Sequence, residues 1–448
     1  MKLLNPDECK VCIVGLGYVG LPLAISLAKT KTSLKTNNLI NRQIIGFDKN
    51  SKRIDELKQG IDRTNEVDNV ILENITNINF SSDEKILNDV DLFIVAIPTP
   101  IDKNNKPDLS ILKNACITIG KSIRFRKSDL APIIVFESTV YPGCTEEQCI
   151  PILEKYSDSK HNSENHKSTF YCGYSPERIN PGDKENKIEN IIKIVSGCNE
   201  KVSKIIDDFY SSFINAGTFR TSSIKVAEAA KIIENTQRDI NIALVNELAI
   251  ICEKLKIDTL DVLNAAATKW NFQHFKPGLV GGHCISVDPY YLTYKSEKLG
   301  YTPQVVLAGR NINDSMSNWL ANRILKEIKK KDISLQECSI LIMGLTFKEN
   351  CPDIRNSKVF EIIKIFKNNG IQVTIFDPLA NKELVMNSKK IAIENTFPKN
   401  KYNVVIIAVA HDEFKNYDLS FWKNLIKKET ICFDLKGILP REINSMRP

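Results

Sequence analysis

Four short apolar runs, each followed by a polar or helical stretch, mark the first half of the chain. The segments that contain them read KVCIVGLGYVG, QIIGFDKN, DLFIVAIPTP and APIIVFESTV. Continuous apolar runs of about four to eight residues are typical of strands buried on both faces of a parallel sheet. Strands that alternate with helices indicate a doubly wound α/β domain. We predict that this domain extends to about residue 215 and that the polar stretch 156–168 is an exposed connection within it.

The strand pattern returns after about residue 335. Four further segments repeat the first four in the same order: CSILIMGLTFKEN (338–350), IQVTIFDPL (371–379), NVVIIAVAHDEF (403–414) and TICFDLKGIL (430–439). The second set lacks the GxGxxG spacing of the first. The sequence therefore predicts two related parallel-sheet domains, 1–215 and 331–448. The second should bind something other than a dinucleotide pyrophosphate, or bind it differently.

Between the two sets lies SIKVAEAAKIIENTQRDINIALVNELAIICEKL (223–255), which contains neither proline nor glycine. Ala, Val, Ile and Leu recur around much of the circumference of the predicted helix, which would extend about 50 Å. A helix with so little polar face is expected to be buried between domains or subunits. We expect it to form the centre of a helical domain, 216–330, and part of a homodimer interface.

The composition is that of an ordinary globular protein, with 42% hydrophobic and 26% charged residues in a chain of 448. The 61 basic and 54 acidic residues are interspersed and leave a net charge of +7. This mild excess suits an anionic small molecule and falls short of a nucleic-acid-binding surface. The first residues lead directly into a strand, and no apolar run approaches the roughly 18 residues that cross a bilayer. We expect no signal peptide, no membrane partner and a cytoplasmic location.

Metal chemistry is not indicated by the cysteines or histidines. Twelve cysteines in such a chain should be reduced and mostly buried. Cys9 and Cys12 form a CxxC pair at the entry to a strand, without the second pair or histidine cluster that a zinc site needs. The five histidines show no metal-ligand spacing. We therefore expect no metal.

A dinucleotide site is predicted where Gly15-Leu16-Gly17-Tyr18-Val19-Gly20 follows the first strand and opens a helix. The first glycine makes the turn, the second lets the backbone approach a pyrophosphate, and the third allows close packing of helix on strand. Asp48 ends the second strand, where an acid binds the adenosine ribose and repels a 2′-phosphate, so NAD is favoured over NADP despite Lys49, Lys52 and Arg53 nearby. The alternative is a glycine turn that only packs. The predicted fold class is α/β, with two Rossmann-like parallel-sheet domains joined by a long central helix.

The segment GLVGGHCISVDP (278–289) places Cys284 behind several glycines. Glycines at this density indicate a loop that closely approaches a ligand, and a thiol there is expected to be accessible and reactive. Lys231 and Asn235 stand four residues apart on the long helix, hence on one face, within an otherwise apolar sequence. A lysine and an amide so placed are suited to holding a developing oxyanion. The alternatives are a Lys231 that reaches solvent and an Asn235 that bonds a neighbouring backbone group.

Seven motifs together resemble those of the UDP-glucose/GDP-mannose dehydrogenase family, over essentially the whole chain. They are GLGYVGLPLA, PTP, ESTVYPG, YSPERINPGD, VAEAAKIIENTQRDINIALVNE, GGHCISVDPYYL and GLTFKENCPDIRNS. Members of this family are NAD-dependent four-electron oxidoreductases that turn the C6 alcohol of a nucleotide sugar into a carboxylate. The resemblance implies this activity, NAD as the cofactor, a UDP-sugar as the substrate and a C-terminal domain that binds UDP.

The resemblance also implies a role for each matching residue. Cys284 matches the family's nucleophile, Lys231 and Asn235 its helix pair, and Asp288 its water-activating acid. Thr139 and Glu177 resemble residues at the cofactor and the reacting centre, and they complete the implied catalytic set. The implied cofactor-binding residues are Gly15, Gly17, Tyr18, Val19, Gly20, Asp48, Arg53, Pro98, Thr99, Thr139 and Arg355. The implied substrate-binding residues are Glu177, Arg178, Lys231, Asn235, Gly281, Phe347 (near uracil) and Lys348; Lys348 and Arg355 resemble groups that contact nucleotide phosphates.

The implied mechanism captures an aldehyde covalently. A first hydride leaves C6, and Cys284 adds to the resulting aldehyde as a thiohemiacetal; a second hydride transfer gives a thioester, which water hydrolyses. A free aldehyde has no good hydride to give until a nucleophile adds to it, which explains the need for a cysteine. Lys231 and Asn235 would stabilise the oxyanions, while Asp288 and Thr139 would orient water. Whether Lys231 or a water on Asp288 removes the first proton stays open.

The expected sugar also follows from resemblance alone. RINPGD after SPE, and GGHCISVDPYYL around the cysteine, differ from the FLREG-like and CFPKD segments of the glucose-oxidising branch. YPGCTEEQC, TKWNF and CPDIRNS are closest to the Vi-antigen and O-antigen enzymes, and Ser286 stands where mannosamine enzymes more often have proline. We expect UDP-N-acetylglucosamine, with UDP-N-acetylgalactosamine and UDP-N-acetylmannosamine as alternatives. The product would serve biosynthesis of a surface polysaccharide such as capsule or O-antigen.

The sequence favours two other classes of function less. Tyr291 and Lys295 fit the YxxxK proton-relay pair of nucleotide-sugar epimerases and dehydratases, but those enzymes usually have GxxGxxG, and the pair lies too far along the chain. A nucleotide-sensing protein without catalysis would be signalled by loss of Cys284, Lys231 or Asp288, and all three are present.

Overall fold

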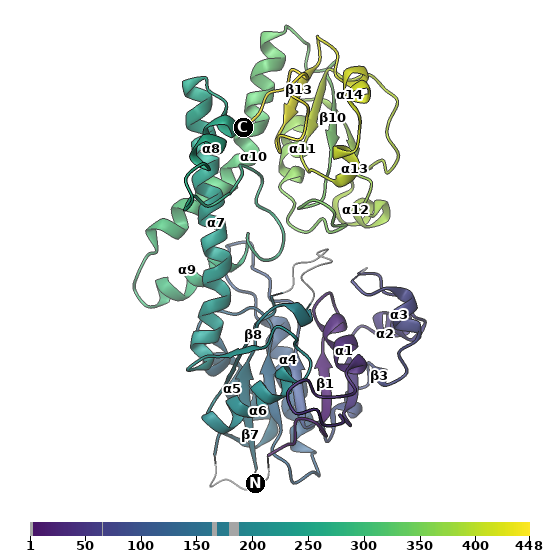
Figure 1. Ribbon diagram of the computed structural model, residues 1–448, viewed down its shortest axis with the longest axis vertical. Helices are drawn as coiled ribbons and strands as arrows, with labels where there is room; N and C mark the ends of the chain where they lie inside the picture. The colour runs from purple at the N-terminus through teal and green to yellow at the C-terminus, as the bar shows by residue number, and fades with distance from the viewer. Residues whose placement is uncertain (1–2, 65, 164–167, 179–187) are drawn as a thin grey trace. The chain divides into compact units, whose positions relative to one another are not determined.

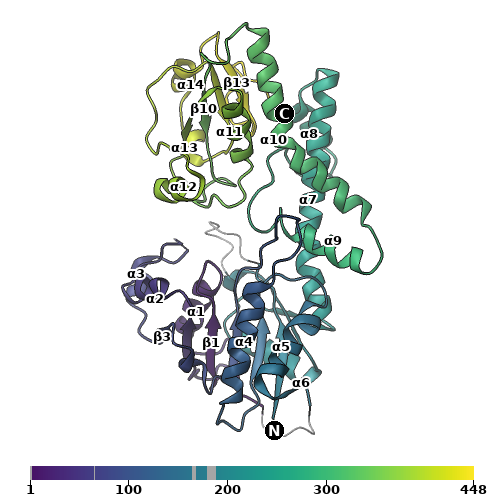
Figure 2. The same ribbon diagram turned by 180° about the vertical axis from the view of Figure 1, so that it is seen from behind.

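A computed structural model describes residues 3–64, 66–163, 168–178 and 188–448. It divides the chain into two compact units, the first comprising 1–234 and 290–299, the second 235–289 and 300–448. Helices α7 (Ile224–Leu255) and α9 (Asp288–Lys298) both run across this division. Figures 1 and 2 show both helices from opposite sides.

The described part of the first unit is built on one sheet in the order β3-β2-β1-β4-β5-β7-β8-β9, with β6 paired to β7. Among the described strand pairs of this sheet, only β7–β8 is antiparallel. The strands are β1 (Lys10–Val14), β2 (Gln43–Phe47), β3 (Ile78–Ser81), β4 (Leu92–Val95), β5 (Ile133–Phe136), β6 (Lys160–His161), β7 (Thr169–Tyr174), β8 (Lys193–Gly197) and β9 (Thr218–Arg220). The chain reverses direction across the sheet between β1 and β4, the position at which such sheets bind nucleotides beyond their carboxyl ends.

Helices cover both faces of this sheet. Val11 and Ile13 of β1 pack in a core cluster with side chains of α1 and α6, and the intervening Cys12 is also fully buried. Burial on both faces explains why the strands read as continuous apolar runs. The helices are α1 (Gly20–Lys29), α2 (Ser51–Lys58), α3 (Asn69–Glu73), α4 (Ser110–Arg124), α5 (Ile150–Ser157), α6 (Glu200–Ser211), the short 3₁₀ segments η1 (Glu84–Leu87) and η3 (Ile188–Asn190), and a π-helix, η2 (Thr145–Cys149).

The second unit contains a parallel sheet in the order β11-β10-β12-β13. Alternate residues of β12 enter two separate core clusters, Val404 and Ile406 on one face and Val405 and Ile407 on the other. The strands are β10 (Ser339–Met343), β11 (Gln372–Phe376), β12 (Val404–Ile407) and β13 (Ile431–Asp434). The helices are α8 (Thr259–Ala266), α10 (Gln304–Lys330), α11 (Val359–Asn368), α12 (Lys382–Lys389), α13 (Asp412–Lys415) and α14 (Leu419–Leu425).

The two longest helices, α7 and α10, are joined by buried polar contacts. Arg310 Nη1 of α10 lies 2.6 Å from Asp239 Oδ1 of α7, and both side chains are almost completely buried. Asn313, one turn further along α10, donates to the same carboxylate oxygen at 2.7 Å. Neither helix, nor any other in the described residues, is long and apolar enough to cross a membrane.

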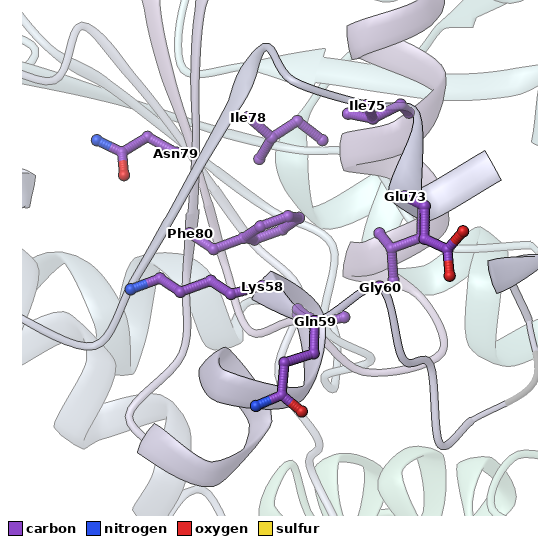
Figure 3. A pocket seen from close by; sticks show the side chains of 10 residues that line it. Lys58, Gln59, Gly60, Glu73, Ile75, Ile78, Asn79 and Phe80 are labelled. Atoms are coloured by element: carbon purple, nitrogen blue, oxygen red, sulfur yellow. The ribbon is translucent and has the colours of Figure 1, made fainter. Parts of the chain in front are cut away.

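A pocket of about 540 Å³ opens beside the edge strand β3 in the first unit. Figure 3 shows Ile78 and Phe80 on one side of it, with Lys58, Gln59 and Glu73 around them. Its walls come from 57–60, 72–73, 75 and 78–80. None of these residues belongs to the set that the motifs predict for cofactor or substrate.

The α/β class, the two parallel sheets and the long central helix are confirmed. The helix predicted over 223–255 is α7, and the eight predicted strand segments correspond to β1, β2, β4, β5 and β10 to β13. The first sheet is larger than those segments imply, because β3 and β6 to β9 extend it at its edges and β8 runs antiparallel to β7. The described part of the polar stretch 156–168 includes the short strand β6. The division at 215 and 330 into three domains stays a prediction.

The repeat between the two halves extends to individual hydrogen bonds. The N–H of Gly15 donates to Phe47 O at 2.8 Å, and that of Gly344 donates to Phe376 O at the same distance. Each glycine has a positive φ, 96° and 91°. The acid that follows the second strand then accepts from the residue after the glycine, Asp48 from Leu16 and Asp377 from Leu345. Both halves therefore use a buried or half-buried carboxylate to hold the turn after their first strand.

Asp377 accepts more hydrogen bonds than Asp48 does. Its oxygens accept four backbone N–H groups, those of Leu345, Thr346, Leu379 and Ala380. His411 accepts from Asn350 N through Nδ1, so its Nε2 carries the proton and donates to Asp377 at 3.2 Å. Burial alone would raise the pKa of Asp377, but the hydrogen bonds from His411 and the backbone lower it below its usual value.

We predict that Asp377→Ala lowers the free energy of unfolding of the second unit by about 3 to 5 kcal/mol, because it leaves several buried donors without an acceptor. The exposed carboxylate of Asp412 gives a matched control, and Asp412→Ala should cost about 1 kcal/mol or less. Urea unfolding of both variants measures the difference. Equal losses would contradict the role assigned to Asp377.

Candidate active site

The glycine turn after β1 has the three features that a dinucleotide requires. A Cβ at Gly15 would lie 2.7 Å from Ala96 O, and one at Gly20 would lie 1.9 Å from Gly15 O, so both positions are closed to any side chain. Gly17 faces open space, with no atom within 4 Å of its Cβ position. The backbone at Gly17 is therefore open to a pyrophosphate while α1 packs tightly behind it. The residues present fit NAD at this turn, with Tyr18 and Val19 half-buried before the helix.

Asp48 and Arg53 support the turn from the second strand. Asp48 is half-buried and accepts from the N–H groups of Leu16 and Asn50, both at 2.9 Å. Arg53 is buried; its Nε donates to Leu16 O at 2.9 Å and its Nη2 lies 2.7 Å from Asp62. Burial alone would raise the pKa of Asp62, but hydrogen bonds from Thr64 and Arg53 lower it. The structure gives Arg53 a contact with the turn itself, and its predicted contact with the cofactor stays a prediction.

The PTP loop after β4 is tied to the loop after β5. Thr99 Oγ1 donates to Thr139 O at 2.6 Å, and the exposed Pro98 precedes it. The hydroxyl of Tyr291, on α9, donates to Thr99 O at 2.8 Å and is completely buried. Lys295 forms an ion pair with Glu147. Tyr291 thus fixes the backbone beside two predicted cofactor residues, and this bond engages the hydroxyl that the YxxxK alternative would need for proton transfer.

Glu177 and Lys231 meet in the interior of the first unit. Lys231 Nζ lies 3.8 Å from Glu177 Oε2, and both side chains are buried. Arg178, predicted to bind the substrate, forms an ion pair with Glu234 at 3.1 Å, and its role in substrate binding stays a prediction. The remainder of the motif that distinguishes the sugar branch, residues 179–183, lies outside the described residues.

A second buried pair supports this region and was not anticipated from the sequence. Lys193 Nζ lies 3.1 Å from Glu137 Oε1 and donates to Pro176 O at 3.2 Å. Tyr210 donates its hydroxyl to the same glutamate at 2.5 Å. Glu137 is two residues before Thr139 and Pro176 is next to Glu177, so the pair links the two loops. A lysine inside the apolar strand KIVSG was the available signal.

Glu228, on α7, is a third residue that the motifs did not single out. It is completely buried, and its carboxylate accepts the N–H groups of Gly143 at 2.5 Å and Thr145 at 2.9 Å. It thereby ties the loop that begins at Thr139 to the helix that bears Lys231, one turn away. Burial raises the pKa of Glu228 to about 7, even though both backbone donors oppose the shift.

Cys284, Asn235 and Asp288 come together in the second unit. Asn235 Nδ2 donates to Asp288 Oδ2 at 2.6 Å, and both side chains are buried. Cys284 lies in the turn just before α9, where its carbonyl accepts the N–H groups of Val287 and Asp288. Ten of the twelve cysteines are buried, whereas Cys284 and Cys198 are partly exposed. The predicted nucleophile is thus a partly exposed cysteine, four residues along the chain from a carboxylate that accepts a hydrogen bond from an amide.

The glycines before Cys284 pack against the loop that follows β10. A Cβ at Gly281 would lie 2.6 Å from Asn356 O, and one at Gly282, whose φ is 84°, would lie 2.8 Å from the ring of Phe347. Asn356 Nδ2 also donates to Gly282 O at 2.9 Å. The predicted substrate residues Gly281 and Phe347 are therefore neighbours, and their closeness requires glycine.

Three charged residues surround the same loop. Lys348 Nζ lies 5.7 Å from the centroid of the Phe347 ring. Arg355 makes a bidentate pair with Asp353; burial alone would raise the pKa of Asp353, and Arg355 lowers it. Lys436, which the motifs missed, follows β13; its Nζ lies 2.8 Å from the Cβ position of Gly278, and burial lowers its pKa. Basic side chains that follow β10 and β13, with Lys348 beside the Phe347 ring, suit an anionic nucleotide.

Comparison with known proteins agrees with this architecture. Three models of the UDP-glucose/GDP-mannose dehydrogenase family match the chain in order: the NAD binding domain over residues 9–214, the central domain over 225–315 and the UDP binding domain over 341–441. The chain belongs to this family. Its N-terminal sheet is the family's NAD-binding domain, and its C-terminal sheet is the UDP-binding domain.

Several family members are similar over their whole length. A UDP-N-acetyl-D-glucosamine 6-dehydrogenase of Pseudomonas aeruginosa is 48% identical over 98% of this chain and 99% of its own, and one of Salmonella typhi is 46% identical over the same shares. Protein CapL of Staphylococcus aureus is 49% identical over 96% of each chain. Among solved structures, the UDP-D-ManNAc dehydrogenase of Pyrococcus horikoshii superposes with a TM-score of 0.83 at 26% identity, over 98% of each chain.

The raised pKa of Glu228 predicts an unusual dependence of stability on pH. An unfolded glutamate titrates near about 4.3, so between there and about 7 the folded state holds a proton that the unfolded state has lost. The stabilisation is complete below about pH 4 and is lost as the pH rises through 7. Glu228→Gln removes this titration, so its free energy of unfolding relative to wild type should rise by about 3 kcal/mol between pH 4.5 and 7.5.

Urea unfolding at a series of pH values measures this slope. The exposed Glu247 of the same helix provides the control, since Glu247→Gln should leave the pH dependence unchanged. A Glu228→Gln difference that stays flat over this range would show that the carboxyl is ionised throughout.

Proposed function

We propose that this protein oxidises the C6 hydroxyl of UDP-N-acetylglucosamine to a carboxylate, with NAD as the oxidant, for synthesis of a surface polysaccharide. The sugar is chosen because two relatives, 46% and 48% identical, are named for it. UDP-N-acetylmannosamine is the second candidate, since relatives named for that substrate are 30% to 32% identical. UDP-N-acetylgalactosamine is the third. The grouping of Cys284 with the Asn235–Asp288 pair is the observation that supports the chemistry most directly.

The covalent steps belong to Cys284. Its sulfur adds to the C6 aldehyde, forming a C–S bond and a thiohemiacetal, and oxidation of that carbon gives a thioester. Water then attacks the thioester carbon, the C–S bond breaks, and the thiolate leaves as the carboxylate forms. NAD, when bound, supplies the hydride acceptor for both oxidations, so that four electrons leave each sugar and two NADH are formed.

Asp288 is proposed to take the proton from the attacking water. Its Oδ2 accepts one N–H of Asn235, which orients the carboxylate and leaves the second amide N–H of Asn235 for an oxyanion on C6. Roles for Lys231, Thr139 and Glu177 at the same carbon remain part of the proposal. Phe347, Lys348 and Arg355 are proposed to bind the uridine and phosphates.

We further propose a homodimer that uses α7. Five large apolar side chains of this helix have exposed fractions between 44% and 62%: Val226, Ile233, Leu244, Ile251 and Leu255. Their separations of 7, 11, 7 and 4 residues place them within about 40° of one another around the helix. An exposed apolar stripe of this length is typical of a protein–protein interface. Light scattering that gave the mass of a monomer would contradict the proposed homodimer. We also propose a cytoplasmic location, in keeping with twelve free cysteines.

The substrate assignment predicts a clear order of rates. With NAD in excess, kcat/KM should be highest for UDP-N-acetylglucosamine among the three UDP-N-acetylhexosamines and UDP-glucose, and two NADH should form for each sugar consumed. Steady-state absorbance of NADH measures both quantities. A preference for UDP-glucose would overturn the choice of sugar, and turnover without net NADH would favour an epimerase or dehydratase.

Replacement of the thiol tests the covalent route. Cys284→Ser keeps the size of the side chain but replaces a good nucleophile and leaving group with a poor one, so we expect kcat to fall by at least about 10³-fold. The variant should stall after the first oxidation or at the ester, which lowers the NADH formed per sugar below two. Carboxylate production by this variant at the wild-type rate would rule out the thioester.

A further inference from the structure

Asn246 lies on the same face of α7 as Asn235, three turns away. Eleven residues separate them, which corresponds to a rise of about 16 Å and an angular difference of only about 20°. Asn235 holds Asp288, at the end of the segment 278–288 that contains Cys284. Asn246 holds Gly278, at the start of that segment. Two asparagines on one helix face therefore hydrogen-bond to the two ends of the nucleophile loop, residues 278–288.

The contact between Asn246 and Gly278 is a complete pairing of amide with peptide. Asn246 Nδ2 donates to Gly278 O at 3.0 Å, and Gly278 N donates to Asn246 Oδ1 at 2.8 Å. The asparagine side chain is completely buried. Both polar groups of one loop residue are thus satisfied by one side chain, where water has no access to replace it.

The orientation of the Asn246 amide is set by a buried ion pair. Asp239, paired with Arg310 at 2.6 Å, is an acceptor only, so the amide of Asn313 must turn its Nδ2 toward it, as it does at 2.7 Å. The oxygen of Asn313 then faces Asn246 and accepts its Nδ2 at 2.8 Å. With that nitrogen fixed, Asn246 Oδ1 is the atom left to accept Gly278 N. All four side chains are at most 1% exposed.

We propose that Asn246 is a positioning residue for Cys284, held in the correct orientation by Asn313, Asp239 and Arg310. It touches neither substrate nor cofactor in this assignment and acts through the backbone of Gly278. The kinetic consequences rest on the proposed function. The pairing of Asn246 with Gly278, which we call the clamp, is a property of the protein alone. We predict that loss of the clamp harms the steps that need the sulfur in place more than it harms binding of the UDP-sugar.

The first experiment compares Asn246→Ala with Asn322→Ala, an exposed asparagine of α10. We expect kcat of Asn246→Ala to fall by about 10- to 100-fold, as for a reacting group displaced by about 1 Å, with KM for the UDP-sugar changed by less than about threefold. Aldehyde should escape and be trapped by hydroxylamine. Hydrogen exchange of the amides in 279–288, measured without any substrate, should become at least about tenfold faster. Asn322→Ala should match wild type in every measurement.

A second experiment tests the order of donors and acceptors and does not depend on whether Asn246→Ala folds. Asn313→Asp places two carboxylates together and should reproduce the defect. Asn246→Asp is the complementary variant, because it keeps an acceptor for Gly278 N but loses the donor to Gly278 O and Asn313 Oδ1. We expect both variants to lower kcat by about 10-fold or more. Wild-type kcat in both would contradict the donor order.

The clamp is overturned if Asn246→Ala keeps wild-type kcat and wild-type exchange of 279–288. Should wild-type protein form no NADH with any UDP-sugar, the proposed function fails instead. The exchange experiment still judges the clamp in that case, because it uses the protein without substrate.

Discussion

Polar side chains buried along α7 impose the central constraint on this molecule. A buried polar group is tolerated only when it is paired, so each one selects a particular partner elsewhere in the chain. The five pairs are Glu228 with Gly143 and Thr145, Lys231 with Glu177, Asn235 with Asp288, Asp239 with Arg310 and Asn246 with Gly278. Each pair lies within one of the two units, and all but the Asp239–Arg310 pair act directly on a loop that bears predicted catalytic residues. The sequence suggests a largely apolar helix, but the buried polar side chains of α7 hold several loops in place.

The two sheets show how one architecture serves two kinds of ligand. In both, a glycine of positive φ follows the first strand, and the acid after the second strand accepts from the next backbone N–H. The halves differ at the positions that follow. The second turn has Thr346 where the first has the open Gly17, and its hydroxyl bonds to Lys348 O. Side chains therefore fill the space that the NAD-binding turn leaves free, and the UDP-binding turn presents Phe347 and Lys348 instead.

Much of the fold was predictable because the strands are buried on both faces and so read as unbroken apolar runs. The strands toward the edges were not, since β6 and β9 have only two and three residues, and the antiparallel pairing of β8 with β7 depends on contacts distant in the sequence. Cys284 and Asn235 were found from their sequence context and Asp288 through motif resemblance; the structure pairs Asn235 with Asp288 and places Cys284 in the turn just before it. Glu228 and Asn246 were missed although they stand in a quoted motif. Their importance depends on partners 85 and 32 residues away, and spacing along a helix gives no sign of those partners.

Selective alkylation of Cys284 tests the central claim most directly. Cys284 is one of only two partly exposed cysteines, so limiting iodoacetamide should modify it ahead of the ten buried thiols. Peptide mass spectrometry during the reaction gives its modified fraction beside the remaining activity. The account predicts that activity falls in proportion to modification of Cys284 and that bound UDP-sugar slows both. Full activity in protein whose Cys284 is completely alkylated would contradict it.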